Sequence, residues 1–214
     1  MSQAPLVLRK SEWIVGQITH ASGAPLVRRW HYSKGCSKAG IMFGLFNGRG
    51  SPILGVSQWL PPTRVAAEFA CKLLGKDPGK WQGVFSLSRL AVHPDVPKNG
   101  ASFLIGQSVQ CLMEAREECH TLVTYADESQ GHTGAIYRAT NWIEAGITAP
   151  APRWIDRAGR QVAKKATTTR TNAEMVALGY FVDGVYTKRR FLMDLDKRKR
   201  RNARNKPVQL AFGF

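Results

Sequence analysis

The chain has 214 residues, of which 31 are Lys or Arg and 15 are Asp or Glu, so its formal net charge is +16 at pH 7. This length suits one hydrophobic core with an appendage, and the 43% hydrophobic content is typical of a folded protein. The positive charge favours a polyanionic partner such as DNA, RNA or an anionic membrane surface. The sequence has no apolar run of about 18 residues and no N-terminal signal peptide, so we expect no membrane span and a cytoplasmic protein.

The first half of the chain predicts short antiparallel strands. Residues 5–20 include a first strand with its surroundings, and residues 41–47 and 52–59 form two strand-like runs. The segment 47–50, Asn-Gly-Arg-Gly, joins these two runs and is a signal for a β-hairpin. Residues 65–74 carry apolar side chains at helical spacing and predict a short helix.

The central segment predicts a β-α-β-α unit. Residues 84–92 predict a strand, residues 103–119 a helix and residues 121–126 a second strand, and residues 134–142 have a helical pattern. The turn at 97–102 contains glycine and small residues. A turn of this kind before a helix can hold a phosphate or pyrophosphate on free backbone N–H groups.

Three residues of this turn favour a phosphate site. Gly100 permits a close approach of the backbone, and Ala101 and Ser102 keep the start of the helix narrow. The helix dipole and the unpaired N–H groups of the first turn attract an anion. Glycine-containing turns between a strand and a helix are also common without any ligand, so an ordinary connection is the alternative.

The end of the chain is densely basic. Residues 172–178 predict a short helix, and residues 180–185 and 187–193 predict the last two strands. Residues 188–206 contain ten Lys or Arg and two Asp. The net charge of this segment is half of the net charge of the chain. Like charges at this density favour contact with a nucleic acid, and a solvated tail is the alternative. The expected nucleic-acid contacts are Lys188, Arg189, Arg190, Lys197, Arg198, Lys199, Arg200 and Arg201.

The order of these elements predicts an α+β (mixed α/β) fold. An antiparallel first half is followed by the β-α-β-α unit and by the terminal strands, which is the pattern of one α+β domain. We place the folded domain at residues 1–187 and a basic C-terminal extension at residues 188–214.

Polar residues that could carry chemistry gather at two places. His31 and Tyr32 stand in a polar turn, where an imidazole can act as a general base or a metal ligand and a phenol can bind ferric iron. Residues 125–134 follow an apolar strand, and open α/β sheets place ligands at the C-terminal ends of strands. In this segment Asp127 is a candidate base, metal ligand or helix cap, and His132 is a candidate ligand or loop hydrogen-bonder.

Two further residues stand on predicted regular elements. Arg89 lies on the central strand, where a buried guanidinium needs an anion or a carboxylate as its partner. Tyr137 follows Gly100 by 37 residues on the next strand-helix unit. It either packs in the core or points toward the reactive end of a bound acyl carrier.

These central segments resemble the GNAT fold, the superfamily of acyl-CoA-dependent N-acetyltransferases. The acyl-CoA turn of that fold has the pattern Gln/Arg-x-x-Gly-x-Gly/Ala, and the matching positions here hold Pro97, Gly100 and Ser102, so the first and last depart from it. A later helix of the fold often carries a tyrosine near the thioester sulfur, and residues 137–142, which begin with Tyr137, resemble it. The resemblance implies a GNAT-like central mixed sheet flanked by helices, in an acetyltransferase-like catalytic domain over residues 1–187.

A narrower resemblance is to the Mom family, phage-encoded DNA-modification proteins with a divergent form of that fold. The segments that match are 31–33 (His-Tyr-Ser), the turn 99–102, and the segment from Tyr125 to Tyr137, in this order. The resemblance covers about residues 25–145. It implies an enzyme that places a carbamoylmethyl (acetamido) group on the exocyclic amine of adenine, using acetyl-CoA and iron, and so protects phage DNA from host restriction.

The resemblance also implies roles for individual residues. The residues implied to bind acetyl-CoA are Arg89, Asn99, Gly100, Ala101 and Ser102. Those implied to surround the iron or the reacting centre are His31, Tyr32, Asp127 and Tyr137. Of these, Tyr137, Asp127 and Tyr32 are the catalytic candidates, and the division between metal ligands and proton carriers stays open. The implied partner is double-stranded DNA and not a membrane, with the target adenine flipped out of the duplex, and the chain is also a candidate homodimer.

Two other functions stay open at this point. The first is a plain N-acetyltransferase that uses acetyl-CoA on an amine of a protein, an aminoacyl-tRNA or a small molecule, without a metal. The second is a nucleic-acid-binding protein that keeps the fold and has no catalytic activity.

Overall fold

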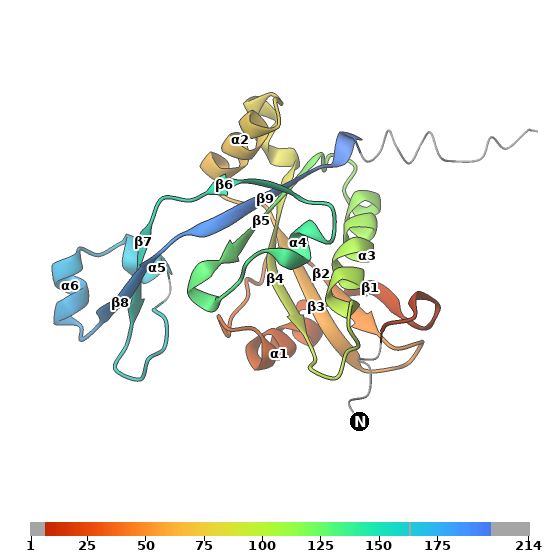
Figure 1. The fold of residues 1–214 in the computed structure, drawn as a ribbon, viewed down its shortest axis with the longest axis horizontal. Helices are drawn as coiled ribbons and strands as arrows, with labels where there is room; N and C mark the ends of the chain where they lie inside the picture. Colours follow the sequence, from red (N-terminus) through yellow and green to blue (C-terminus); the bar gives the residue numbers. More distant parts are fainter. Residues whose placement is uncertain (1–6, 163, 198–214) are drawn as a thin grey trace, which may run out of the picture.

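The computed structural model describes residues 7–162 and 164–197. Its centre is a seven-stranded sheet in the order β1-β2-β3-β4-β5-β9-β6 (Figure 1). All neighbouring strands are antiparallel except β4 and β5, which are parallel. The strands of this sheet are β1 (Ile14–Ile18), β2 (Ile41–Phe46), β3 (Ile53–Leu60), β4 (Val84–Val92), β5 (Thr121–Asp127), β6 (Ile143–Ile147) and β9 (Lys188–Asp194).

Helices cover both faces of this sheet. The helices of the described residues are α1 (His20–Trp30), α2 (Arg64–Leu73), α3 (Gly100–Ala115), α4 (Ala135–Arg138), α5 (Lys164–Thr168) and α6 (Asn172–Ala177), and the last two lie between β7 and β8, away from this sheet (Figure 1). Three short 3-10 helices span Lys10–Glu12, Pro78–Gly83 and Glu128–Gln130. None of the helices in the described part of the chain is long and apolar enough to cross a membrane.

Adjacent residues of each central strand point to opposite layers. On β4, Phe85 packs in the cluster that contains Ile105 of α3, whereas Val84 packs in the cluster that contains Ala67 of α2. Successive side chains of a strand face opposite sides of the sheet, so α3 and α2 must cover opposite faces. The α1 helix lies on the same face of the sheet as α2. Its Val27 packs in a cluster with Met42 of β2, whereas the next residue of that strand, Phe43, packs in the cluster on the α3 side.

The two parallel strands separate toward their C-terminal ends. They pair only from Val84 opposite Thr121 to Ser86 opposite Val123. Beyond this point β4 continues beside β3, and β5 continues beside β9 to Asp127. The fork opens at the C-terminal ends of parallel strands, where sheets of this kind bind ligands.

A second unit is attached beside the last strands of the sheet. The strands β7 (Ala151–Ile155) and β8 (Phe181–Tyr186) form a two-stranded sheet, with α5 and α6 in the connection between them (Figure 1). Arg153 of β7 forms an ion pair with Asp183 of β8, and its Nη1 donates a hydrogen bond of 3.0 Å to the carbonyl of Ser129. This contact fixes the second unit to the segment that follows β5.

The predicted fold class is confirmed, and several predicted bounds change. The strand predicted at residues 84–92 is β4, and the predicted hairpin is β2–β3. The helix predicted at residues 103–119 is α3, which starts and ends earlier, at Gly100 and Ala115. It starts at Gly100 because the residue before it, Asn99, adopts a left-handed conformation. No helix was predicted for α1, which contains Pro25 at an interior position.

The boundary expected after residue 187 falls inside the sheet. Residues 188–194 form β9, which lies between β5 and β6, so Lys188, Arg189 and Arg190 belong to the folded domain. Lys197 is the last described residue. Arg198, Lys199, Arg200 and Arg201 lie outside the described residues.

Candidate active site

Two cavities meet at the segment 134–141 that contains α4. The larger, of about 810 Å³, is called the α3 cavity here and lies between α3, residues 139–143 and the end of β9. The smaller, of about 400 Å³, is called the histidine cavity and lies in the fork between β4 and β5. The side chains of the histidine cavity used below are His31, Tyr32, Arg89, Tyr125, His132 and Tyr137.

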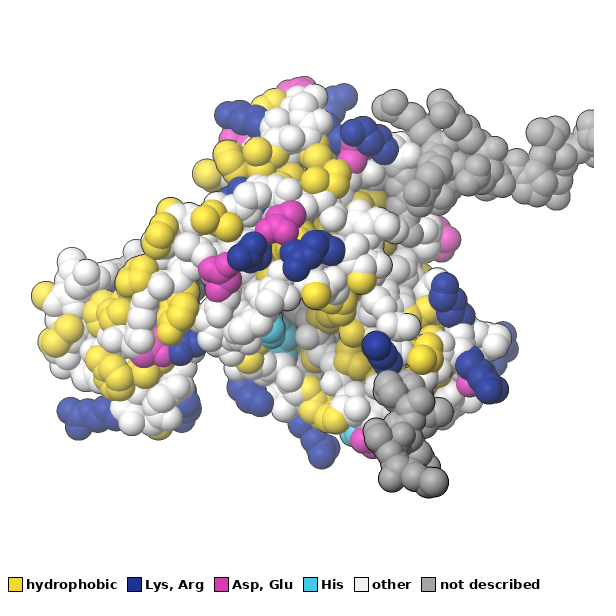
Figure 2. Space-filling view, viewed as in Figure 1, with side chains coloured by type: hydrophobic (Ala, Val, Ile, Leu, Met, Phe, Trp, Pro, Cys, Tyr) yellow, Lys and Arg dark blue, Asp and Glu magenta, His cyan; other side chains and the backbone are white. Residues whose placement is uncertain are grey.

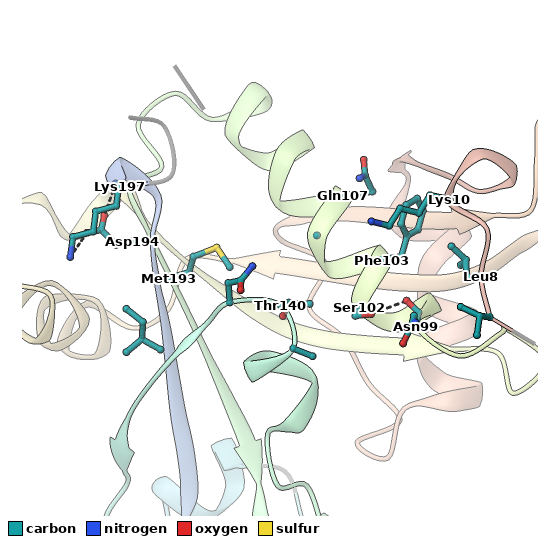
Figure 3. Close-up of a pocket in the computed structure, with 15 residues that line it drawn as sticks. Leu8, Lys10, Asn99, Ser102, Phe103, Gln107, Thr140, Met193, Asp194 and Lys197 are labelled. Atoms are coloured by element: carbon teal, nitrogen blue, oxygen red, sulfur yellow. Dashed lines mark hydrogen bonds and ion pairs between the residues drawn. The ribbon is translucent and has the colours of Figure 1, made fainter. Parts of the chain in front are cut away.

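One face of α3 forms a wall of the α3 cavity. The wall residues are Asn99, Ser102, Phe103, Gly106 and Gln107, which are spaced three or four apart and so share a helix face (Figure 3). A Cβ built on Gly106 would meet no atom within 4 Å, so this glycine leaves open space at the wall. Lys10 brings a positive charge to the same cavity, whereas Lys197 lies 3.8 Å from the carboxylate of Asp194, which also lines it. The cavity has the size that an elongated ligand needs, and Lys10 offers a cation to a phosphate group.

The structure changes the interpretation of the glycine turn. Gly100 and Ala101 are absent from the walls of the α3 cavity, whereas Asn99 and Ser102 line it. The N–H of Gly100 donates to the carbonyl of Pro97 at 3.0 Å, so it does not offer a free donor to a phosphate. A Cβ on Gly100 would lie 2.1 Å from Cγ1 of Val96. The glycine is therefore required by packing against Val96.

His31 and Tyr32 enter the histidine cavity directly after α1. The two rings are stacked with centroids 4.3 Å apart, and the Tyr32 ring meets His132 edge-on at 5.6 Å. Nδ1 of His31 accepts a hydrogen bond of 3.1 Å from the backbone N–H of Ser33. A nitrogen that accepts cannot carry the proton, so the neutral ring holds its proton on Nε2.

The buried His31 ring is neutral at physiological pH. It is 8% exposed, and burial together with the positive charge of Arg89 lowers its pKa to about 4. The ring is therefore a hydrogen-bond donor through Nε2 rather than a general base near pH 7.

Both tyrosines stay protonated. Burial, with the nearby charge of Asp127, raises the pKa of Tyr32 to about 12. Burial also raises the pKa of Tyr137, although a hydrogen bond with Thr124 acts in the opposite direction. The Tyr137 ring is fixed by contacts with Trp142 and Phe191, with centroids 5.9 and 5.1 Å away. Both phenols can act as proton donors at neutral pH.

Asp127 is engaged by the protein on both carboxylate oxygens. Oδ1 accepts hydrogen bonds from the N–H and the hydroxyl of Ser129, at 3.1 and 2.7 Å. Oδ2 lies 2.7 Å from Nζ of Lys188. Burial acts to raise the pKa of Asp127, but the hydrogen bonds from Lys188 and Ser129 outweigh it, so the pKa is lowered. The residue caps the 3-10 helix that follows it, which was one of the predicted alternatives.

Arg89 lies in the histidine cavity and not beside the glycine turn. Its Nε donates to the carbonyl of Gly35 at 2.5 Å, and its Nη1 donates to the carbonyl of Ser88 at 2.6 Å. In the described part of the chain no carboxylate forms an ion pair with this half-buried guanidinium. Arg89 therefore gives the cavity a positive charge and fixes the loop that follows Tyr32.

The residues implied for iron do not offer a free donor set. Both oxygens of Asp127 and Nδ1 of His31 accept hydrogen bonds from protein groups, and both phenols have raised pKa values. Within the described residues, no group of three or more His, Cys, Asp or Glu side chains is placed to hold a metal ion. The residues, as they are arranged, do not fit an iron centre.

The basic residues of β9 are balanced inside the fold. Lys188 pairs with Asp127, and Arg189 pairs with Glu128 at 3.1 Å and with Glu144 at 3.0 Å. The guanidinium of Arg190 lies over the ring of Phe69 at 4.6 Å and over that of Tyr125 at 5.9 Å. Strand pairing in the sheet brings these groups together. The three residues therefore do not form the free basic surface that the sequence predicted.

Sequence reasoning gave no role to several residues of the cavities, among them Tyr125 and Gly106. Tyr125 lies two residues before Asp127 on β5 and lines the histidine cavity, a placement that the two-residue period of a strand indicates. Gly106 stands in the middle of a long helix, where glycine lowers helix stability relative to alanine. A glycine at such a position is a signal for a close approach or an open wall.

Comparisons with known proteins identify the family and the fold of the chain. A family model described as the Mom protein family matches residues 12–209. Methylcarbamoylase mom of Escherichia phage Mu is 27% identical over 124 residues, which are 55% of this chain and 46% of that protein. This match thus spans about half the length of the relative.

Similar solved structures include proteins described as acetyltransferases. Spermidine N-acetyltransferase from Vibrio cholerae superposes with a TM-score of 0.51 at 8% identity, over 89% of this chain and 98% of that one. IAA acetyltransferase from Bacillus cereus has a TM-score of 0.50 at 12% identity, over 85% and 99% of the two chains. These similarities confirm the predicted GNAT-like fold.

Proposed function

Because the chain belongs to the Mom protein family, whose model matches residues 12–209, we propose that it is a transferase that modifies adenine in DNA. The proposed product carries a carbamoylmethyl (acetamido) group on the exocyclic amine, as the name of the methylcarbamoylase of phage Mu suggests. Acetyl-CoA is the proposed source of the two-carbon unit. In a phage, the modification protects DNA from host restriction.

The charge of the histidine cavity is the observation that carries this proposal. No Asp or Glu is found among its described wall residues, and Arg89 supplies a positive charge. An aliphatic amine is a cation near pH 7, with a pKa of about 10.4, and would be repelled by Arg89. The exocyclic amine of adenine belongs to a neutral aromatic ring, and the aromatic walls of this cavity suit such a ring.

The α3 cavity is the proposed site of the acyl carrier. The first turn of α3 and Lys10 favour its phosphate groups. Residues 139–141 line the α3 cavity, and Tyr137 in the same segment lines the histidine cavity. The thioester end of the carrier then lies beside Tyr137, between the two cavities.

Tyr137 is the proposed proton donor. Its pKa is raised, so its hydroxyl is protonated and can donate to the CoA thiolate that leaves when a nitrogen donor other than the adenine amine attacks the thioester carbonyl. This step breaks the carbon–sulfur bond, releases CoA as a thiol and forms the amide of the acetamido group. The bond between the adenine amine and the methyl carbon is a separate two-electron oxidation, which requires an external oxidant and is not assigned to Tyr137. The neutral His31 donates through Nε2 and orients the acceptor. Asp127 holds Lys188 and Ser129 in place instead of acting as the base.

The adenine must leave the duplex to reach this site. The cavity in the fork between β4 and β5, of about 400 Å³, is large enough for a single extruded base. Tyr32 is 39% exposed and stands at its edge, where it can stack on the extruded base. No step of the proposal passes through iron, since the residues implied for it are engaged by other groups.

The direct test is mass spectrometry of nucleosides from DNA of cells that express the protein. We expect a carbamoylmethyl derivative of adenine with the wild type and its loss with Tyr137→Phe. Tyr180→Phe is the control, because Tyr180 lines neither cavity. DNA that contains only unmodified adenine, from cells with abundant folded wild-type protein, rules the proposal out.

A plain N-acetyltransferase is the second candidate, favoured by the fold of the similar structures. It would release CoA from acetyl-CoA with a small amine, a peptide or an aminoacyl-tRNA in the absence of DNA. An assay of CoA release with these acceptors and with duplex DNA separates the two functions. If the protein has no catalytic activity, Tyr137→Phe leaves its biological effect unchanged.

A further inference from the structure

The segment on both sides of His31 and Tyr32 is basic without any acidic residue. Residues 13–67 contain six Lys or Arg and no Asp or Glu. Four of the six, Arg28, Arg29, Lys34 and Lys38, stand within eleven residues and are all exposed. We call these four residues the α1 basic surface. Figure 2 shows Lys and Arg side chains at the lower edge of the molecule, where α1 lies in Figure 1.

The cations of this surface form no ion pair within the described residues, unlike Lys188 and Arg189 of β9. Among residues 7–162 and 164–197, none of the four forms an ion pair with a carboxylate. The C-terminal dipole of α1 favours Arg28 and Arg29 at their positions, and Nζ of Lys34 donates a hydrogen bond of 3.1 Å to the carbonyl of Arg29 in the last turn of this helix. Lys38 lies beyond the helix. An external anion is the remaining partner for these charges.

Two side chains from the central strands hold the loop in place. Gln58 of β3 is 1% exposed, and its Nε2 donates to the carbonyls of Ser37 at 2.7 Å and Ala39 at 3.3 Å. Arg89 of β4 donates to the carbonyl of Gly35. The loop that carries Lys34 and Lys38 is thus positioned before any ligand binds, which lowers the entropy cost of binding.

We infer that the α1 basic surface binds the phosphate backbone of the DNA strand whose base enters the histidine cavity. The surface flanks Tyr32 on both sides in sequence, and Tyr32 lines that cavity. Cations beside an aromatic cavity match a phosphate backbone beside an extruded base. No large hydrophobic side chain of α1 is exposed, so the surface does not suit insertion into a membrane.

This inference rests on the proposed function, because it assumes DNA as the acceptor. It places the phosphate contacts beside the catalytic cavity, in addition to any made by residues 198–201. The backbone contacts would position the strand, while the cavity selects the base.

The salt dependence of DNA binding tests the inference. Each phosphate contact contributes about 0.9 to the slope of log Kobs against log salt concentration. The variant Arg28→Gln, Arg29→Gln, Lys34→Gln, Lys38→Gln should therefore lower the slope by about 3 to 4 on a random-sequence duplex. The control variant Arg49→Gln, Lys72→Gln, Lys80→Gln, Arg116→Gln removes four exposed charges elsewhere and should leave the slope near that of the wild type.

Folding and function are followed separately. Thermal melting and acetyl-CoA binding of the first variant should match the wild type, since the four residues lie outside the α3 cavity. Equal slopes for the first variant and the control overturn the inference. If the slope changes but the wild type makes no modified adenine, the proposed reaction fails and the surface stands. If modified adenine forms and the slope does not change, the surface fails and the reaction stands.

Discussion

Nζ of Lys188 lies 2.7 Å from Oδ2 of Asp127, and the two residues face each other across β5 and β9. This pair joins a residue predicted to catalyse with a residue predicted to bind DNA. Each satisfies the charge of the other, so neither is free for the role that the sequence indicated. The ion pair instead fixes the end of β5 beside the histidine cavity.

Removal of Lys188 should destabilise the fold. Asp127 is only 4% exposed, and Lys188→Met would leave a buried carboxylate without its cation. We expect a loss of about 1–2 kcal/mol, because Lys188 itself is partly exposed. Urea denaturation at pH 7 measures it. Lys197→Met is the control, with an expected loss below about 0.5 kcal/mol, because Lys197 is exposed and 3.8 Å from Asp194.

The difference in stability between the wild type and Lys188→Met should depend on pH. The pKa of Asp127 is lowered in the folded state, so its contribution is present above pH about 4 and is lost as the pH falls through that lowered value. The wild type and Lys188→Met should therefore converge in stability as the pH falls below this lowered pKa. A difference that stays constant from pH 7 to below this pKa would show that the ion pair does not cause it.

His31 should make the protein less stable as the solution becomes mildly acidic. Its pKa is about 4 in the folded state against about 6.5 in the unfolded chain, so the unfolded chain binds the proton first. The contribution is complete above pH 6.5 and falls by up to about 3 kcal/mol as the pH approaches 4. Urea denaturation at pH 7 and pH 5 should show a smaller drop for His31→Asn, which keeps an acceptor for Ser33.

The control for this experiment is His93→Asn. Nδ1 of His93 accepts a hydrogen bond from the N–H of Asp95 at 3.1 Å, the same local contact that His31 makes with Ser33. His93 is more exposed than His31, so this variant removes the same local contact at a less buried position. Equal pH dependence in the wild type and His31→Asn would contradict the prediction.

The local pattern of the sequence predicted most of the regular elements. The strands β2, β3, β4 and β5 follow from apolar runs bounded by turn residues, and these runs need no knowledge of distant contacts. The α1 helix was missed because Pro25 and Gly23 disfavour a helix locally. Its amphipathic packing against β2 outweighs their propensities.

The site was predicted less completely because its charges pair across strands. The register that sets Lys188 opposite Asp127 joins residues 61 positions apart, and no local pattern specifies it. The same holds for Arg189, whose partners are Glu128 and Glu144. The sequence therefore indicated the charged groups but could not separate internal ion pairs from free cations.

Replacement of Gly106 by alanine should stabilise the fold and weaken the binding of acetyl-CoA. An alanine at this helical position meets no neighbour within 4 Å and should raise the free energy of unfolding by about 0.5–1 kcal/mol. Its methyl group enters the α3 cavity, so the KM for acetyl-CoA should rise several-fold with little change in kcat. Gly16→Ala is the control, because Gly16 also has open space but lines neither cavity. An unchanged KM in Gly106→Ala would exclude this wall as the acetyl-CoA site.

Gly100 should be required by packing and not by contact with a phosphate. The Cβ of Gly100→Ala would lie 2.1 Å from Val96, so we expect a loss of about 1–3 kcal/mol in stability. The double variant Gly100→Ala, Val96→Ala removes the clash and should recover most of this loss. Chemical denaturation measures the recovery, and the KM for acetyl-CoA is measured on the double variant. A KM near the wild-type value supports the packing role, whereas a high KM in the restored fold would return Gly100 to the phosphate site.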